Sequence, residues 1–93
     1  MLEIRLNCEN CDTALPNNSA EAMICSYECT FCKDCVDHVL SNVCPNCGGG
    51  FEKRPSRPKG DLGKRPPRKD KVFKPVKHNA FLEKNKEIPP RER

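Results

Sequence analysis

The chain has 93 residues and a formal net charge of +4; only 35% of its residues are hydrophobic, and eight are cysteines. An ordinary globular domain is about 45–50% apolar, so this composition excludes a multidomain enzyme and any fold that needs a large core. No apolar run approaches the roughly 20 residues of a membrane span, and the N-terminal MLEIRL does not resemble a signal peptide. We therefore expect a cytoplasmic protein that makes no membrane contact.

Charge is divided unevenly along the chain. Residues 1–50 hold all eight cysteines and carry two basic and seven acidic side chains, a formal charge of −5. Residues 51–93 carry fifteen basic and six acidic side chains, a charge of +9, and seven of the nine prolines. We therefore predict two parts, a cysteine-rich acidic head over residues 1–50 and a proline-rich basic tail over residues 51–93.

The head begins with short extended elements. Alternating apolar residues predict an edge strand over residues 2–6, and residues 12–18, with a proline and paired asparagines, predict a loop. Residues 22–25 and 28–31 predict a small hairpin.

One helix is expected after the hairpin, over residues 33–42. Its apolar residues recur at helical spacing, and Asp34 and Asp37 suit the positive N-terminal end of the helix dipole. Three consecutive glycines end the head at residues 48–50. The expected core comprises Leu15, Ile24, Phe31, Val36, Val39, Leu40 and Val43.

The cysteine spacing is the strongest signal in the sequence. A Cys-x2-Cys turn places two thiolates where both can bind one ion, at about 2.3 Å per zinc–sulfur bond. Eight soft ligands complete two tetrahedral sites, and disulfides are disfavoured in a reducing compartment. Because so short a chain cannot be stabilised by its core alone, we predict two structural Zn²⁺ ions. Sites closed by four thiolates leave no position for water, and no catalytic constellation is visible, so we expect a binding protein and not an enzyme.

Two ways of sharing the cysteines are compatible with the spacing. Sequential pairing groups the first four and the last four cysteines, which makes two separate units with little core between them. Interleaved pairing alternates between the sites and ties the head into one unit.

Iron competes with zinc for four-thiolate sites, so iron or an iron–sulfur cluster is the alternative cofactor. His38 follows Cys35 by three residues and is an alternative ligand, although the plainer interpretation is an exposed helix residue. His78 is expected to be solvated in the tail. Phe31 is expected in the core, whereas Tyr27 fits a core position and a contact surface equally well.

The order Cys-x2-Cys, x13, Cys-x3-Cys-x2-Cys-x2-Cys, x8, Cys-Pro-x-Cys resembles an all-cysteine RING finger over residues 6–48. Residues 29–32 (CTFC) stand where RING domains have His-x-Phe-Cys, and residues 44–47 (CPNC) stand where they have Cys-Pro-x-Cys. The resemblance implies a small metal-stabilised α+β domain, a cross-braced treble clef of ββα type. It also implies interleaved sites of Cys8, Cys11, Cys32 and Cys35, and of Cys25, Cys29, Cys44 and Cys47.

Ubiquitin ligase activity is a further implication of a RING, and it is carried over residue by residue. Ligases commonly have an apolar residue where this chain has Asn10, and often a cation where it has Gly48; of the usual partner contacts, Pro45 remains. Two departures out of three argue against a ligase.

The whole chain resembles more closely a family of short bacterial proteins, the domain-of-unknown-function 1272 family. The resemblance implies a bacterial source and no established function. It rests on residues 1–3, 7–12, 15–16, 29–32, 44–49 and 54–58.

The tail has few apolar residues and many charges and prolines, which predicts a disordered or extended chain. Residues 80–87 predict one or two weak helical turns. The tail is interpreted as a solvated linker, as an arm lying across the acidic head, or as a polyanion-binding arm. The candidate polyanion contacts are Lys53, Arg54, Arg57, Lys59, Lys64, Arg65, Arg68, Lys69 and Lys71.

Together these observations predict a structural zinc module that binds another protein. The first alternative is a nucleic-acid-associated zinc protein that contacts phosphates through its tail. A redox-sensing zinc protein, which needs a reactive low-pKa thiolate, and a ubiquitin-ligase-like RING are the remaining alternatives.

Overall fold

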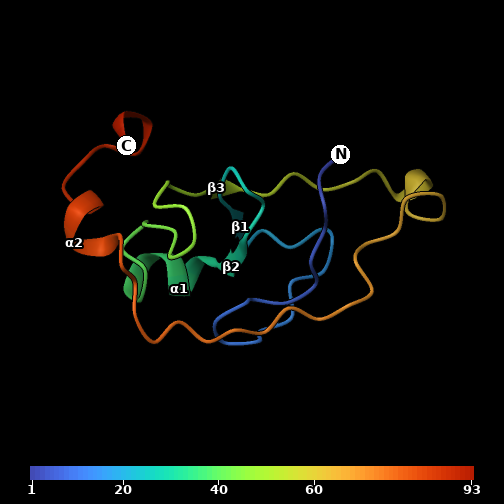
Figure 1. Cartoon of the computed structure of the whole chain (residues 1–93). Coiled ribbons are helices and arrows are strands. Elements are labelled where there is room, and N and C mark those ends of the chain that lie inside the picture. Colours follow the sequence, from blue (N-terminus) through green and yellow to red (C-terminus); the bar gives the residue numbers. More distant parts are fainter.

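A short hairpin forms the centre of the fold. In the computed structural model, which describes residues 1–93, β1 (Ala22–Ile24) pairs antiparallel with β2 (Thr30–Cys32), so that Met23 lies opposite Phe31. A third strand, β3 (Glu52–Lys53), pairs antiparallel with the other edge of β1, which gives the sheet order β2-β1-β3. The helix α1 (Lys33–His38) continues directly from β2 (Figure 1). The result is a small α+β head.

The hairpin expected from the sequence is confirmed, but the helix is shorter than expected. It ends at His38 and not at residue 42, because Ser41 and Asn42 adopt positive φ angles of 48° and 58° that an α-helix cannot contain. The turn has a purpose in the fold: the Asn42 side chain accepts a hydrogen bond from the Phe51 N–H at 2.9 Å.

The edge strand expected over residues 2–6 does not form. Only Asn7 pairs, in an isolated antiparallel bridge to Ala14. The backbone of the N-terminal segment bonds instead to the tail: the Ile4 carbonyl accepts from the Arg68 N–H at 2.8 Å, and the Arg5 carbonyl from the Arg54 side chain at 2.6 Å. Apolar alternation identifies a half-buried extended segment. It does not say whether a neighbouring strand or an arginine will donate hydrogen bonds to the carbonyls of that segment.

The core is small and shares its space with the cysteines. Five of the seven expected core residues are buried, whereas Ile24 is half-buried and Val39 is 47% exposed. Ile4 and Phe51, two large apolar residues outside that expectation, are buried as well. The Phe51 ring packs edge-on against Phe31, with ring centroids 5.5 Å apart. The head therefore extends past residue 50, where the sequence suggested that it ends.

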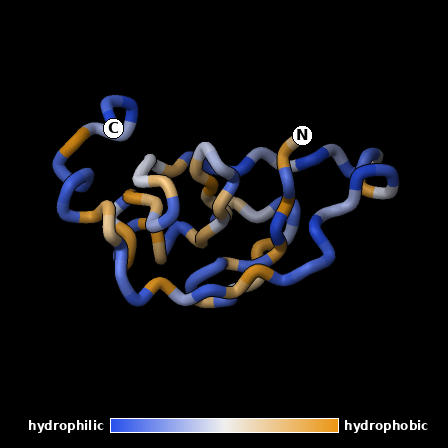
Figure 2. Tube along the Cα trace, viewed as in Figure 1, coloured by the Kyte–Doolittle hydropathy of each residue, from blue (hydrophilic) through white to orange (hydrophobic).

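The tail runs back along the head. It contains only short helical turns, η1 (Lys59–Asp61), α2 (Leu82–Asn85) and η2 (Pro90–Glu92), joined by extended chain. Figure 1 shows its orange portion passing beside the N-terminal segment before it reaches α2. Hydrophobic residues gather in the head, whereas the far loop around η1 is hydrophilic (Figure 2). None of the helices is long and apolar enough to cross a membrane.

Glycines admit the end of the tail to the surface of the head. Gly48 has a φ of 80°, and a Cβ there would lie 2.7 Å from the Asn85 side-chain nitrogen. A Cβ at Gly50 would lie 2.6 Å from the Pro90 Cβ. The glycines that the sequence marked as the end of the head therefore form the seat of α2 and η2.

Arg54 is the buried charge that holds the head together. Its side chain is 4% exposed and donates to three carbonyls, those of Arg5 at 2.6 Å, Leu15 at 3.1 Å and Pro16 at 2.7 Å. Burial lowers the pKa of this guanidinium. Arg54, one of the predicted polyanion contacts, is thus enclosed in the head, and both of its terminal nitrogens donate to carbonyls.

Replacement of Arg54 tests this arrangement. Arg54→Ala leaves three carbonyls without their donor, of which only that of Leu15 is in a fully buried bond. Because water can replace the donor at the other two, and one hydrogen bond to a charged group contributes about 1.5–3 kcal/mol, we expect a loss of roughly 3 kcal/mol in the free energy of unfolding. Denaturant unfolding at constant zinc activity measures it. Lys53→Ala, at the exposed neighbouring position, is the control and should change stability by less than about 0.5 kcal/mol; equal losses in both variants would contradict the assignment.

Candidate metal centre

Four cysteine sulfurs converge in what we call the first cluster, Cys8, Cys11, Cys32 and Cys35. All four sulfurs lie within 4.8 Å of one another, and those of Cys11 and Cys32 are 3.7 Å apart. Sulfurs at the corners of a tetrahedron with bonds of about 2.3 Å to zinc are roughly 3.8 Å apart. The donor set and its spacing therefore fit a four-thiolate zinc site.

The chain builds the first cluster from a turn and a helix. Cys8 and Cys11 belong to a tight turn, which we call the first knuckle, closed by a hydrogen bond from the Asp12 N–H to the Cys8 carbonyl at 2.9 Å. Asp12 turns the chain with a φ of 64°. Cys32 ends β2 and Cys35 lies in the first turn of α1, so the β2–α1 junction supplies the other two sulfurs.

The second cluster comprises Cys25, Cys44 and Cys47, whose sulfurs lie within 4.8 Å of one another. Cys29 adjoins it, because its sulfur shares hydrogen bonds with the sulfurs of Cys25 and Cys44. Cys25 and Cys29 flank the β1–β2 turn, where Glu28 adopts a φ of 67°. Residues 44–47 form a second knuckle at the other side of the cluster.

The two clusters take alternate parts of the chain. Cys29 stands immediately before β2 and adjoins the second cluster, whereas Cys32 ends β2 and belongs to the first. Of the two groupings that the spacing leaves open, the sulfurs lie as interleaved pairing requires. β2 therefore runs from the second cluster to the first.

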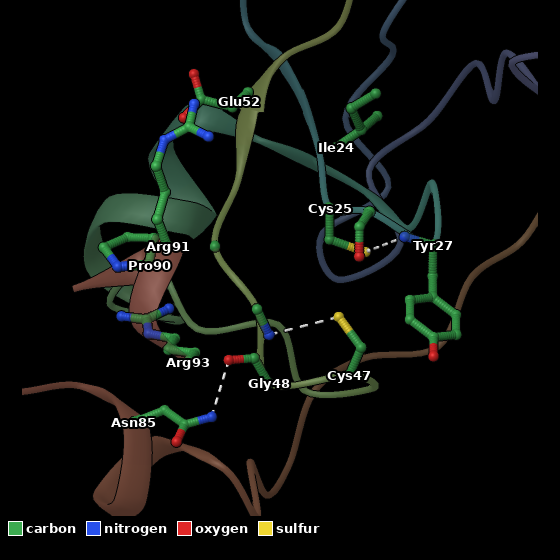
Figure 3. A pocket seen from close by; sticks show the side chains of 13 residues that line it. Ile24, Cys25, Tyr27, Cys47, Gly48, Glu52, Asn85, Pro90, Arg91 and Arg93 are labelled. Carbon is green, nitrogen blue, oxygen red and sulfur yellow. Dashed lines mark hydrogen bonds between the residues drawn. The ribbon is translucent and has the colours of Figure 1, made fainter. Parts of the chain in front are cut away.

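Backbone amides point at several of the sulfurs. The N–H groups of Tyr27, Asn46 and Gly49 donate to the sulfurs two residues before them, at 3.4, 3.4 and 3.5 Å. Figure 3 shows those at Tyr27 and next to Gly48. Such bonds stabilise thiolate charge, which a metal site requires.

Two asparagine side chains add donors that the sequence analysis did not identify. Asn10 Nδ2 donates to the Cys35 sulfur at 3.3 Å, and Asn46 Nδ2 donates to the Cys29 sulfur at 3.4 Å. Each asparagine lies inside a Cys-x2-Cys turn, next to one pair of ligands and facing a ligand of another segment. That repeated position is the signal from which they were identifiable.

The thiols of the second cluster share protons unevenly. Hydrogen bonds from Cys25 and Cys44 lower the pKa of Cys29 to about 2. Its hydrogen bond to Cys29 raises the pKa of Cys25 to about 11, and the pKa of Cys44 is raised by its bonds to Cys25 and Cys29. Metal binding here must therefore release the protons that Cys25 and Cys44 hold.

Cys11 behaves differently because it lies at the surface. Its slight burial raises its pKa, but hydrogen bonds to Thr13 outweigh that effect and lower the pKa to about 7. The Thr13 hydroxyl lies 3.0 Å from its sulfur. Cys11 is the exposed sulfur of the first cluster, as the half-exposed Cys47 is of the second.

Glu9 ties the first knuckle to β2. Its N–H donates to the Thr30 carbonyl at 3.0 Å, and its carboxylate accepts from the Thr30 N–H at 2.5 Å and from the Arg5 guanidinium at 2.6 Å. Thr30 stands between Cys29 and Cys32. Glu9 therefore fixes the segment that joins the two clusters.

The remaining candidates lie apart from the sulfurs. His38 is an exposed residue of α1, 3.6 Å from Asp34, and His78 is exposed in the tail. Phe31 is in the core as expected, and Tyr27 is 74% exposed. Tyr27 stands at one side of a cleft of about 510 Å³ beside Cys47, with Glu52 and Arg91 at the other (Figure 3).

Several candidate polyanion contacts already bind the head. Arg57 donates to the carbonyls of Leu2 and Arg65, Arg68 pairs with Glu3 at 3.0 Å, and Lys71 pairs with Asp12 at 3.0 Å. The others are exposed and have no ion pair with an acidic side chain, namely Lys53, Lys59, Lys64, Arg65 and Lys69.

The Asn46 contact predicts a selective effect on metal affinity. Partners of metal ligands typically change affinity about 10–100-fold when removed, so Asn46→Ala should weaken binding at the second cluster about tenfold and spare the first. Chelator competition resolves the two sites, with the first cluster as internal reference. Asn18→Ala, at an exposed loop position, is the matched control; an equal loss at both clusters would contradict a local role for Asn46.

Comparison with known proteins identifies the family of this chain. A family model described as "Protein of unknown function (DUF1272)" matches residues 1–57. An uncharacterized protein of Rhizobium meliloti (strain 1021) is 51% identical over 75 residues, which cover 81% of this chain and 89% of the relative. No solved structure matches the chain. The resemblance to the domain-of-unknown-function 1272 family is thus confirmed, and the chain belongs to the DUF1272 family.

Proposed function

We propose that the protein is a zinc-binding module with two structural sites and that it acts by binding another protein. The observation that carries the proposal is the convergence of the cysteine sulfurs into two clusters that lie at the two ends of β2. Cys8, Cys11, Cys32 and Cys35 would hold one ion, and Cys25, Cys29, Cys44 and Cys47 the other. Zinc in such sites supplies folding free energy and no open coordination position.

The fold that this proposal implies is a RING-like cross-brace. Interleaved clusters, a hairpin between them and a helix after the hairpin agree with the treble-clef arrangement that the cysteine order suggested. In such a head the metals replace a large core, which agrees with the presence of most of the cysteines in the buried cluster. A role in binding follows from the closed sites, because a substrate would find no free metal position.

Metal content tests the proposal directly. Native mass spectrometry of the full chain should show two Zn²⁺ ions, and chelation should unfold the head because the ligands no longer have a common partner. Circular dichroism follows the unfolding. Iron in place of zinc, or fewer than two metals with thiols still reactive, would contradict it.

Paired substitutions distinguish the two ways of sharing the ligands. Cys8→Ser with Cys32→Ser removes ligands from one interleaved site, so one ion should remain; under sequential pairing the same variant damages both sites. Cys8→Ser with Cys25→Ser is the matched control with the opposite pattern, and under interleaved pairing it should retain no ion. Cobalt substitution counts the intact tetrahedral thiolate sites by their absorbance.

A second candidate function rests on the far loop around η1. Lys59, Lys64, Arg65 and Lys69 are exposed there and form no ion pair with an acidic side chain, and the loop projects at one end of a molecule 42 Å long (Figure 1). An exposed cluster of cations binds phosphates with an affinity that falls steeply as salt rises. Nucleic acid is the partner that this feature favours.

Duplex DNA affinity at two salt concentrations checks the second candidate. Replacing Lys59, Lys64, Arg65 and Lys69 with alanine should reduce both the affinity and its salt dependence, by about 0.9 in logarithmic slope for each lost phosphate contact. Replacing Lys84 and Lys86, exposed cations at α2, is the control and should change little. No binding by the wild-type chain at low salt would reject this candidate.

A further inference from the structure

One stretch of the tail lies along the head as an extended peptide lies in a binding site. We call residues 68–79 the strap. Its backbone bonds to the head at every second residue: the Val72 carbonyl accepts from Asn7 Nδ2 at 2.8 Å, the Lys74 N–H donates to the Glu9 carbonyl at 2.8 Å, and the Val76 N–H donates to Asn10 Oδ1 at 2.7 Å. This alternation is how proteins recognise extended peptides, with main-chain bonds for affinity and side-chain pockets for selectivity.

The two valines are the half-buried side chains in the middle of the strap. Val72 and Val76 are half-buried, and Val76 packs against the core cluster of the head. Phe73 is 52% exposed, and Lys74 and Pro75 are exposed. Val76 therefore makes the apolar contact with the core, whereas the exposed Phe73 does not.

The head offers a groove at this place. The head lines it with Phe31 of β2, Glu9 of the first knuckle, and Pro45 and Asn46 of the second knuckle. Residues 74–78 of the strap lie over it and leave a space of about 280 Å³ between strap and head. The groove is thus partly filled by the strap and has room for bulkier side chains.

Charge favours a basic occupant. Residues 1–50 carry a formal charge of −5, and acidic side chains stand along the strap. Arg68 pairs with Glu3 and Lys71 with Asp12, both at 3.0 Å, whereas Lys74 and Lys77 are exposed. Two bound zinc ions with eight thiolates would make the head more negative still.

The strap is attached in a way that permits exchange. It is joined to the head by the exposed loop around η1, where Gly60 and Gly63 have no neighbour within 4 Å of a Cβ. Its bonds go mostly to backbone and amide groups, which any extended peptide satisfies. A tethered segment competes with free ligands at an effective concentration on the order of millimolar.

We propose that the groove between the two knuckles is a binding site for an extended basic segment of a partner protein, of the pattern Val-x-Lys-x-Val, and that the strap is its resident competitor. The inference rests on the interaction role proposed above. It fails separately from the metal sites, because two bound zinc ions without peptide binding would remove this proposal alone.

A labelled peptide of residues 68–79 tests the groove by fluorescence anisotropy. The full chain with Lys74→Pro and Val76→Asp, which removes one strap N–H and the packed valine, should bind this peptide at least about tenfold more tightly than the wild-type chain, in which the strap competes. A peptide with Val76→Asp should lose binding, whereas one with Phe73→Ala should bind unchanged. Equal binding to both chains, or binding to neither, would overturn the proposal.

Hydrogen exchange provides a measurement on the wild-type chain, where folding is not in question. Excess unlabelled peptide should reduce the protection of the Lys74 and Val76 amides in the isotopically labelled chain, because it displaces the strap. Unchanged protection at peptide concentrations that saturate the variant would overturn the proposal. A dimer in the ultracentrifuge that Val76→Asp abolishes would assign the groove to the strap of a second copy and likewise overturn the assignment to a partner.

Discussion

The fold depends on the two residues between Cys29 and Cys32. Because those cysteines face different clusters, Thr30 and Phe31 must run extended between them, and this stretch forms most of β2. Its side chains then lie on opposite faces. Phe31 enters the core, and the backbone of Thr30 is bonded on both sides to Glu9. Strand, core and first knuckle are consequences of one short span held at both ends.

The separation of charge between an acidic head and a basic tail also has a structural consequence. The N-terminal segment forms no strand, so its carbonyls need other donors, and arginines from the first part of the tail supply them. Arg54 bonds to the Arg5 carbonyl and Arg57 to that of Leu2. The DUF1272 match ends at residue 57, the second of these arginines. The segment shared with the family therefore includes both arginines that bond to the N-terminal carbonyls.

The sequence was informative for residue types that have a single structural role in a chain of this kind, such as the cysteines. Cysteine spacing located the ligand clusters, and periodicity located the hairpin and the start of the helix. It was less informative where a residue has several uses. Nothing local distinguishes a buried arginine such as Arg54 from its exposed neighbour Lys53, because burial depends on carbonyls about 40 residues or more away in the chain. Asn10 is an intermediate case: its position inside a Cys-x2-Cys turn is visible in the sequence, whereas its sulfur partner on α1 is not.

Asn10 also connects the cysteine-rich head to the basic tail. One end of its amide donates to the Cys35 sulfur, and the other accepts from the Val76 N–H of the strap. An amide held at its oxygen has its N–H₂ group directed toward the sulfur, so a docked strap favours the thiolate form that binds metal. By linkage, a metal ion bound at the first cluster would favour the docked strap to the same degree. The strap and the first cluster are therefore joined through a single amide.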